Sequence, residues 1–295
     1  MNTHANLLLL ACLLCLGAPI TAQVELGLFG GTSTYEGDLS PTSLTARLQG
    51  LRSTFGGYGR IDVGPNLSFR GYVQQLKIQA SDADRLSTQA RNLSFHSNIL
   101  ELGVEAELYV LPNYQRIAPF VSFGASVYNF NPLTEYQGRD VELQPLGTEG
   151  QGLPGFRPRY ALTRFAVPVG IGIRYRINDY FNVTARGSAR LTFFDHLDDV
   201  SGNYVNYFTL LDGRGIDGAA GNGSLAAALG DRRGEFLGTD PFDVPTGQRR
   251  GDPTNNDWYY SATIGVGYTL GSGLFDRGSS HGDRGASRYN RCYQF

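Results

Sequence analysis

Hydrophobic and polar residues alternate with a period of two over eight stretches of this chain, and the gaps between the stretches are alternately short and long. In the clearest stretch, 99–110, every second residue is apolar and three glutamates lie on the opposite face, namely Glu101, Glu105 and Glu107. Successive residues of a β-strand point to opposite faces of a sheet, so each stretch predicts a strand with one apolar face. A tilted strand of roughly 9 to 11 residues is long enough to cross a bilayer.

The spacing of these stretches predicts the architecture. The predicted strands lie at about 24–34, 53–63, 67–79, 93–110, 118–129, 160–177, 181–195 and 258–270. Three connections are tight (64–66, 112–117 and 178–180) and four are long, which is the distribution of short periplasmic turns and long extracellular loops. We therefore expect an all-β fold, a transmembrane antiparallel β-barrel of about eight strands with both chain ends in the periplasm. A secreted β-sandwich is the alternative, but its strands are shorter and its loop lengths do not alternate in this way.

Two local features refine this expectation. In the third strand the apolar residues change parity between Val73 and Leu76, which predicts a β-bulge near Gln74 and Gln75. The longest loop, about 196–257, contains a short predicted helix at 224–229, with Ser224 as its N-cap and a stop at Gly230.

Charged residues on the polar strand faces predict what fills the barrel. Both signs occur on neighbouring strands, and paired charges are tolerable in a narrow interior where isolated charges are very costly. About eight strands enclose a lumen that side chains can fill, so we expect a plugged barrel and not a pore. The alternation places Glu25, Arg60, Asp62 and Arg70 inside. The predicted lumen charge network consists of Glu101, Glu105, Glu107, Arg164, Arg174, Arg176, Arg186 and Arg190.

The N-terminus predicts export. An apolar run at 7–18 is too short for a membrane helix, and Ala22 precedes Gln23 in a context suited to signal-peptidase cleavage. A lipoprotein signal ending at Cys12 is the alternative, but the apolar run before it is short. We expect a signal peptide at 1–22, an outer-membrane barrel at 23–271 and a periplasmic C-terminal tail at 272–295.

Composition narrows the function classes. The 39 Gly and the 12% aromatic residues are typical of membrane strands, aromatic girdles and loose loops. A formal net charge of -2 gives no reason to expect a nucleic-acid partner. After removal of the signal peptide, Cys292 is the one remaining cysteine, which excludes an internal disulfide and a Cys-rich metal site. No cofactor and no small-molecule substrate are expected.

Compact polar motifs occupy the long connections, where loop sequences normally drift. They are YEGDL at 35–39, FNP at 130–132, LGTEGQ at 146–151, TFFDHLDDVS at 192–201, RGDP at 250–253 and NDWY at 256–259. Their order across the whole barrel resembles the PorG family, small outer-membrane proteins of the type IX secretion system of the Bacteroidetes. The resemblance extends from about Val24 to the C-terminal Phe295.

The resemblance implies a non-enzymatic role in protein transport. A barrel of this family would associate, on its periplasmic side, with the ring formed by the lipoprotein PorK and its partner PorN. The tail is Gly-rich and basic, a composition that is disordered when alone. It is either a solvated terminus or a docking peptide that orders on a partner. The predicted partner-binding residues are Arg284, Arg288, Tyr289, Arg291, Cys292, Tyr293 and Phe295.

The acidic motif after the seventh strand is a candidate for other chemistry. A His beside carboxylates can activate water, but Asp195 and His196 are neighbours and would point to opposite faces of a strand. Calcium at Asp195, Asp198 and Asp199 is a second hypothesis, although the alternating Asp spacing of a calcium loop is absent. Acidic turns are usually only solvated or capping. The leading function is thus a structural and docking component of the secretion machinery, and the alternative is a small passive channel or surface-adhesion barrel.

Overall fold

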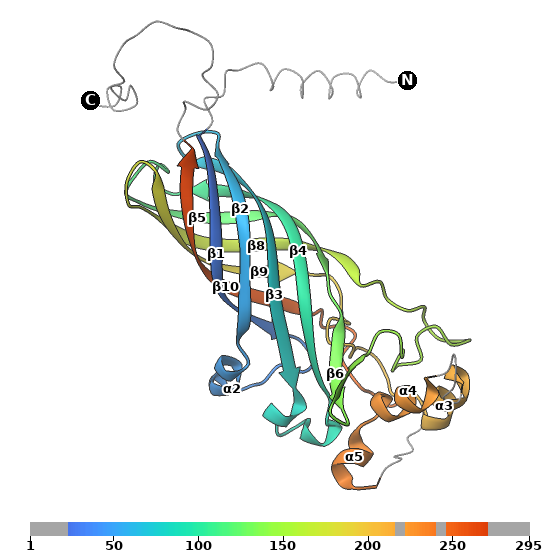
Figure 1. The fold of residues 1–295 in the computed structure, drawn as a ribbon. Coiled ribbons are helices and arrows are strands. Elements are labelled where there is room, and N and C mark those ends of the chain that lie inside the picture. Colours follow the sequence, from blue (N-terminus) through green and yellow to red (C-terminus); the bar gives the residue numbers. More distant parts are fainter. Residues whose placement is uncertain (1–22, 216–221, 240–245, 271–295) are drawn as a thin grey trace, which may run out of the picture.

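The computed structural model describes residues 23–215, 222–239 and 246–270. The predicted signal peptide at 1–22 and the predicted tail at 272–295, with all its partner-binding residues, lie outside these ranges. Within them, eight long strands form a closed antiparallel barrel (Figure 1). These strands are β1 (Gln23–Glu36), β2 (Arg52–Asp62), β3 (Leu67–Ser81), β4 (Ser94–Tyr109), β5 (Ile117–Asn129), β8 (Thr163–Arg176), β9 (Phe181–Leu191) and β10 (Trp258–Leu270).

Hydrogen-bonded neighbours close the sheet on itself. The order around the barrel is β3-β2-β1-β10-β9-β8-β5-β4, and β3 also pairs with β4. Every pairing in the ring is antiparallel, and β1 joins β10 over the full length from Val24↔Leu270 to Glu36↔Trp258. The predicted all-β barrel of about eight strands is confirmed.

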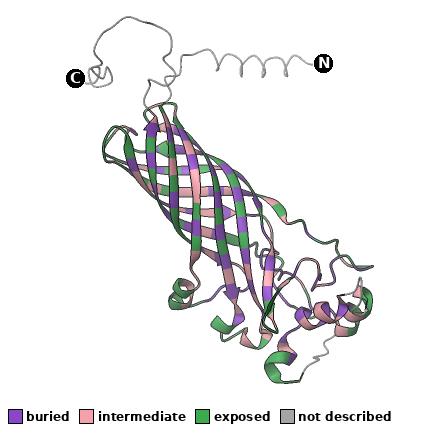
Figure 2. Ribbon diagram, in the orientation of Figure 1, coloured by how far each residue is buried: buried purple, intermediate pink, exposed green. Residues whose placement is uncertain are grey.

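The alternation seen in the sequence separates the outside of the barrel from its inside (Figure 2). Outward apolar side chains such as Leu28, Phe165 and Ile264 are between 65% and 76% exposed, whereas the inward charged residues are buried. The 13 residues of β10 rise about 30 Å if the strand is tilted by about 40°. Trp258 and Tyr260 lie at one end of this height, and Tyr268 stacks on Tyr180 at the other. Aromatic residues therefore border the apolar belt at both ends.

The predicted bulge in β3 is wrong. The β3–β4 register runs without interruption from Leu67↔Leu108 to Ser81↔Ser94. Leu76 and Ile78 point inward like Arg70 and are 0% and 1% exposed. Their parity changes because the interior of the barrel changes from charged to apolar along its axis. At the long-loop end, the barrel opens into a hydrophobic core formed by the long loops.

The long loops carry the remaining elements at the end opposite the tight turns (Figure 1). A hairpin of β6 (Pro132–Tyr136) and β7 (Arg139–Glu142) continues the wall beside β4, turning at Gln137 and Gly138, both with positive φ. The helices are α2 (Leu44–Gln49), η1 (Asp82–Asp84), η2 (Gln89–Arg91), α3 (Tyr207–Arg214), α4 (Gly223–Gly230) and α5 (Arg233–Leu237).

The predicted helix in the longest loop is present, with different ends. Helix α4 starts at Gly223 after Asn222, so Ser224 lies inside the first turn and is not the N-cap. Gly230 is the last residue of the helix, and Asp231 is its C-cap. Asn222 precedes the helix without a side-chain capping hydrogen bond, and α4 packs against α3. Among the described residues, none of the helices has the length and apolar character needed to cross a membrane.

Candidate functional site

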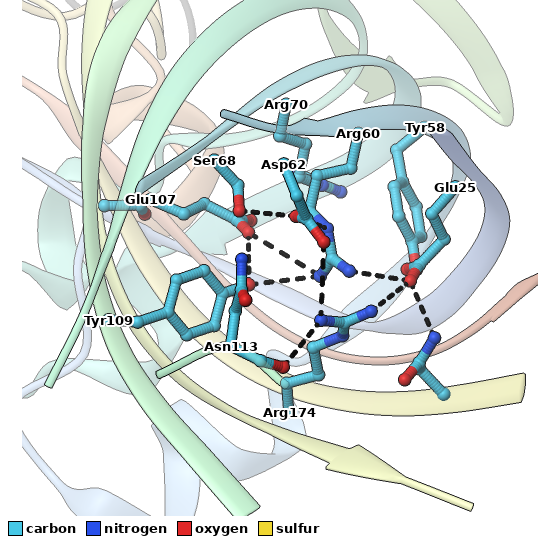
Figure 3. Close-up of polar contacts among 12 residues, drawn as sticks. Glu25, Tyr58, Arg60, Asp62, Ser68, Arg70, Glu107, Tyr109, Asn113 and Arg174 are labelled. Carbon is cyan, nitrogen blue, oxygen red and sulfur yellow. Dashed lines mark hydrogen bonds and ion pairs between the residues drawn. The ribbon is translucent and has the colours of Figure 1, made fainter. Parts of the chain in front are cut away.

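The lumen is filled by side chains in three layers. The first lies near the tight turns, since Arg174 donates to the carbonyl of the turn residue Asn113 at 3.0 Å, and Figure 3 shows its polar contacts. Glu25 is its centre and is 1% exposed. Its Oε2 atom accepts hydrogen bonds from Arg60 and Arg174, each at 2.7 Å, and from Asn182 at 2.8 Å. The Tyr58 hydroxyl donates to Oε1 at 2.7 Å. Glu25 and its four partners come from four strands, β1, β2, β8 and β9. A single carboxylate therefore connects much of the barrel circumference.

The second layer lies at mid-height. Glu105 Oε2 pairs with Arg186 at 2.7 Å and with Arg70 at 3.1 Å. Arg186 also binds Glu107, and its guanidinium lies 4.9 Å from the centre of the Phe120 ring. One arginine thus bridges two glutamates of the same strand, an arrangement that suits the forked geometry of its guanidinium group.

The third layer lies toward the long loops and is centred on Glu101. Its carboxylate accepts hydrogen bonds from Tyr72 at 2.5 Å, Gln74 at 2.6 Å and Tyr259 at 3.2 Å. Arg190 Nε lies 3.3 Å from Glu101 Oε2. Glu101 is fully buried, so the charge is compensated by both an ion pair and neutral donors.

The structure brings together six of the eight residues of the predicted network: Glu101, Glu105, Glu107, Arg174, Arg186 and Arg190. Arg174 pairs with Glu25 and not with the glutamates of β4. The expectation that Arg164 meets a lumen glutamate is wrong, because its guanidinium instead lies 4.2 Å from the centre of the Phe194 ring and donates to the Ala161 carbonyl.

Arg176 is also outside the network. It is half-buried at the end of β8, where its backbone N–H donates to the Arg116 carbonyl at 2.9 Å. Among the described residues, no carboxylate lies within 4.0 Å of its guanidinium. Both misplaced arginines have the parity of the lumen, but they lie at strand ends where the three layers stop.

The paired side chains leave little free space. A cavity between the first two layers, lined by residues such as Tyr58, Arg60 and Arg186, has a volume of about 10 Å³. That is about the space needed for one water molecule.

At the long-loop end of the barrel, beyond the third layer, the long loops fold together into a cap. Its hydrophobic core joins strand residues such as Ile99 and Tyr128 to loop residues such as Phe130, Leu197 and Leu229, all at most 1% exposed. The loops are therefore packed against one another and against the upper barrel, and do not project separately into solvent.

At the centre of the cap, two carboxyl groups contact the hydroxyl of one tyrosine. The Tyr35 hydroxyl lies 2.6 Å from Asp198 Oδ2 and 2.6 Å from Asp257 Oδ1. A phenol has one proton to donate, so one of the two carboxyl groups must be protonated and donate to the tyrosine oxygen. Burial raises the pKa of Asp198 and of Asp257 well above the usual range, in agreement with a shared proton.

A second cluster surrounds Asp199. Its carboxylate accepts from Thr148 at 2.5 Å and from Tyr160 at 2.6 Å. Its backbone has φ of 65°, a left-handed conformation that costs a non-Gly residue of order 1–3 kcal/mol. Arg250 donates to its carbonyl at 2.6 Å and pairs with Glu149 at 3.0 Å. Burial raises the pKa of Asp199 to about 6.

The residues considered for catalysis and calcium point in different directions. His196 packs its ring 5.1 Å from Tyr160 and 5.6 Å from Phe194, and burial lowers its pKa. The two side-chain oxygens of Asp195 have no hydrogen-bond partner, and burial raises its pKa to about 7. Asp198 and Asp199 are bound to separate protein donors. Within the described ranges no group of three or more His, Cys, Asp or Glu is arranged to hold a metal ion.

The loop motifs found in the sequence all meet in this cap. Tyr35, Thr148, Asp198, Arg250 and Asp257 come from five of them and form one buried network. The sequence indicated that these segments were unusual, but not that they contact one another. The missed signal was the clustering of Asp, Tyr and Arg in loops, because buried polar residues need partners from elsewhere in the chain.

Comparison with known families gives a limited match. A family model described as "Domain of unknown function (DUF6089)" matches residues 4–147, slightly less than half of the chain. The match covers β1 to β7 and stops before the second half of the barrel. No curated protein sequence matches this chain.

Several solved structures of bacterial outer-membrane proteins are similar in general shape. Ail, the attachment invasion locus protein of Yersinia pestis, is 8% identical, covers 84% of this chain and 99% of its own, and has a TM-score of 0.39. Neisserial surface protein A is 8% identical, with 85% and 97% covered and a TM-score of 0.38. OprG from Pseudomonas aeruginosa is 9% identical, with 84% and 95% covered and a TM-score of 0.38. The barrel assignment itself rests on the strand register of this chain.

Proposed function

We propose that this chain is an exported outer-membrane barrel that acts as a non-enzymatic structural and docking component of a type IX protein secretion machinery. The observation that carries the proposal is the closed lumen: three layers of paired side chains leave a cavity of about 10 Å³ between the first two. A lumen filled by side chains in this way supports a role carried by the surfaces of the barrel. The order of loop motifs that resembles the PorG family supports the secretion role.

The outer-membrane location is supported by the outside of the barrel. Its exposed apolar side chains form a belt, and a soluble protein rarely exposes so large a continuous apolar surface. Aromatic residues border the belt at both heights, as in transmembrane barrels. Cleavage of the chain after Ala22 is part of the same proposal.

We place docking on the periplasmic side. The turns there are short, at 63–66, 110–116 and 177–180, so they offer little surface. The tail would supply most of the contact with ring proteins of the PorK and PorN type. Arginine and aromatic residues dominate the energetics of many interfaces. The tail residues concerned are Arg284, Arg288, Tyr289, Arg291, Cys292, Tyr293 and Phe295.

Truncation after Gly271 tests this proposal. We expect a folded, membrane-inserted barrel that no longer co-purifies a periplasmic ring from gently solubilised outer membrane. A matched control replaces Arg284, Arg288 and Arg291 by Lys, which keeps the charge and should retain part of the ring. Co-purification of the ring by the truncated barrel would place docking elsewhere. Failure of the intact chain to retain any ring would contradict the secretion role itself.

The structured cap favours a second candidate, a surface-adhesion barrel. Four loops form one buried network on the side opposite the tight turns, which gives the cell surface a fixed face. Binding of cells carrying the chain to host matrix or to other cells, with no ring in the pull-down, would favour this alternative. Measurable ion conductance in planar bilayers would favour a passive channel and contradict the closed lumen.

A further inference from the structure

Helix α2 (Leu44–Gln49) packs none of its residues into the interior of the protein. It contains only six residues, with Ser43 as N-cap accepting a hydrogen bond from the Ala46 N–H. Isolated helices of this length are unstable in water, since helix formation has a costly nucleus. A further contact is therefore needed to explain why this segment is helical.

Side chains attach the helix to the barrel wall: Arg52 of β2 donates to the Gln49 carbonyl at 3.2 Å, and Arg47 reaches β1. Arg47 binds the Glu36 carboxylate through both guanidinium NH groups, one of them at 3.0 Å to Oε1. Its Nε donates to the Pro41 carbonyl at 2.9 Å. Figure 1 shows α2 at the long-loop end of the barrel, next to the end of β2.

This attachment fixes the height of α2 relative to the apolar belt. Glu36 is the register partner of Trp258, and Thr34 is the partner of Tyr260. Arg47 also lies within electrostatic reach of the Tyr260 side chain. The helix is thus level with the aromatic residues that end the belt, which in membrane barrels mark the interface between hydrocarbon and headgroups.

Two leucines form an apolar strip on the exposed side of α2, beside the exposed Thr45 and Gln49. Leu44 and Leu48 are four residues apart, so they lie on the same face of the helix, and they are 72% and 59% exposed. Arg47 instead reaches back to the barrel. This orientation is the reverse of that in a soluble helical protein, where the apolar face packs inward. Next to Glu36, the outward positions of β1 are Thr34, Thr32 and Gly30, and Phe55, three residues past the start of the neighbouring β2, is 55% exposed.

We propose that α2 is an in-plane membrane anchor, with Leu44 and Leu48 inserted at the headgroup–acyl boundary of the outer leaflet. Amphipathic helices bind membranes in this way, in proportion to their buried apolar area. The height of α2, level with Trp258 and Tyr260 at the end of the belt, identifies lipid as the occupant. The inference rests on the proposed outer-membrane location and adds a contact that no strand makes.

Depth-dependent quenching tests the anchor. The full chain, with its three cysteines replaced by Ser, receives single Cys residues for a fluorescent label and is reconstituted in phosphatidylcholine–phosphatidylglycerol nanodiscs. The labelled positions are Leu44, Leu48, Leu86 and Ile264. Leu86 is a matched control because it is also a loop leucine, 91% exposed, and Ile264 is the control for the belt.

We expect spin-labelled lipid to quench the labels at positions 44 and 48 about as strongly as the label at 264, with shallow spin labels more effective at 44 and 48 and deep ones at 264. Iodide in the water should quench only the label at 86. If the labels at 44 and 48 behave like the label at 86, or are shielded from both quenchers, the anchor is overturned while the barrel stays in the membrane. If lipid does not quench the label at 264, the proposed membrane location fails as well.

Discussion

The lumen and the cap are both buried and polar, but they compensate charge in different ways. In the lumen, five acids face five arginines: Glu25, Asp62, Glu101, Glu105 and Glu107 against Arg60, Arg70, Arg174, Arg186 and Arg190. The cap also contains ion pairs, Arg250 with Glu149 and Arg91 with Asp82. In addition it holds four buried aspartates that have no arginine or lysine within ion-pair distance among the described residues: Asp195, Asp198, Asp199 and Asp257. They hold protons or accept hydrogen bonds from neutral groups.

This difference separates two kinds of sensitivity. A balanced ion-pair network is disturbed most by a change of charge, because the remaining partner is left buried and uncompensated. An acid-rich network is disturbed most by a change of pH, because its stability depends on bound protons. Variants of each region should therefore fail under different conditions and leave the other region intact.

Charge reversal in the lumen should have the largest effect. Glu105→Arg would place a third guanidinium beside Arg70 and Arg186, and removal of one partner from a buried pair costs about 3–5 kcal/mol. We expect loss of the heat-modifiable gel shift of the folded barrel, or its loss at a much lower temperature. The control is Glu135→Arg on the exposed hairpin, which should behave like the native chain. An unchanged shift in Glu105→Arg would contradict the assigned network.

The lumen could be predicted because its information is local. The parity of one strand tells which residues share a face, so the inward positions of Glu105 and Arg186 follow without knowledge of their partners. The parity of a residue does not give its height along the barrel axis. For that reason parity assigns Arg164 and Arg176 to a network that they do not join. It also assumes that apolar residues face lipid. Leu76 and Ile78 break that rule because the upper interior is itself apolar.

The cap could not be predicted in the same way. Tyr35 is 163 residues from Asp198 and 222 residues from Asp257, so no local periodicity relates them. The contacts exist because the closed barrel brings the ends of β1, β9 and β10 together. The sequence marked the motifs as unusual, and only the fold explains why they occur together.

A smaller change in the lumen sharpens the comparison. Arg186→Lys retains the charge but removes the fork that reaches Glu105 and Glu107 at the same time. Losing one charged hydrogen bond should lower the free energy of unfolding by about 2 kcal/mol. Arg164→Lys, outside the network, should have little effect in the same urea titration. Equal effects of the two substitutions would show that total charge, and not the bridging geometry, stabilises the lumen.

The corresponding change in the cap is Tyr35→Phe. It removes the hydroxyl between Asp198 and Asp257 and should cost about 1–2 kcal/mol locally. The cap lies outside the ion-pair layers, at the long-loop end of the barrel. We therefore expect faster tryptic cleavage of the long loops with an unchanged heat-modifiable shift. Tyr180→Phe, at an exposed tight turn, is the control. If Tyr35→Phe unfolds the whole barrel, the two regions are not energetically separate.

The last prediction concerns the pH dependence of the cap. Asp195 has a pKa raised to about 7 by burial, so the folded cap binds its proton more tightly than the unfolded chain does. The protonated form therefore stabilises the fold below the ordinary pKa of an Asp, and this contribution is lost as the pH rises from about 4 through 7. Asp198, Asp199 and Asp257 act in the same direction. We expect hydrogen exchange in the loops to accelerate between pH 5 and 8, relative to the intrinsic rate, while the lumen strands remain protected.

Asp195→Asn removes the titrating group and keeps its shape. The variant should show a weaker pH dependence of loop exchange between pH 6 and 8, while Asp84→Asn, at an exposed position, should leave the dependence unchanged. If the native cap exchanges equally at both ends of this range, the buried acids are stabilised by contacts that tolerate their charge. If instead the lumen strands lose protection together with the loops, the cap supports the barrel, and proton loss in the loops would weaken the ion-pair layers below.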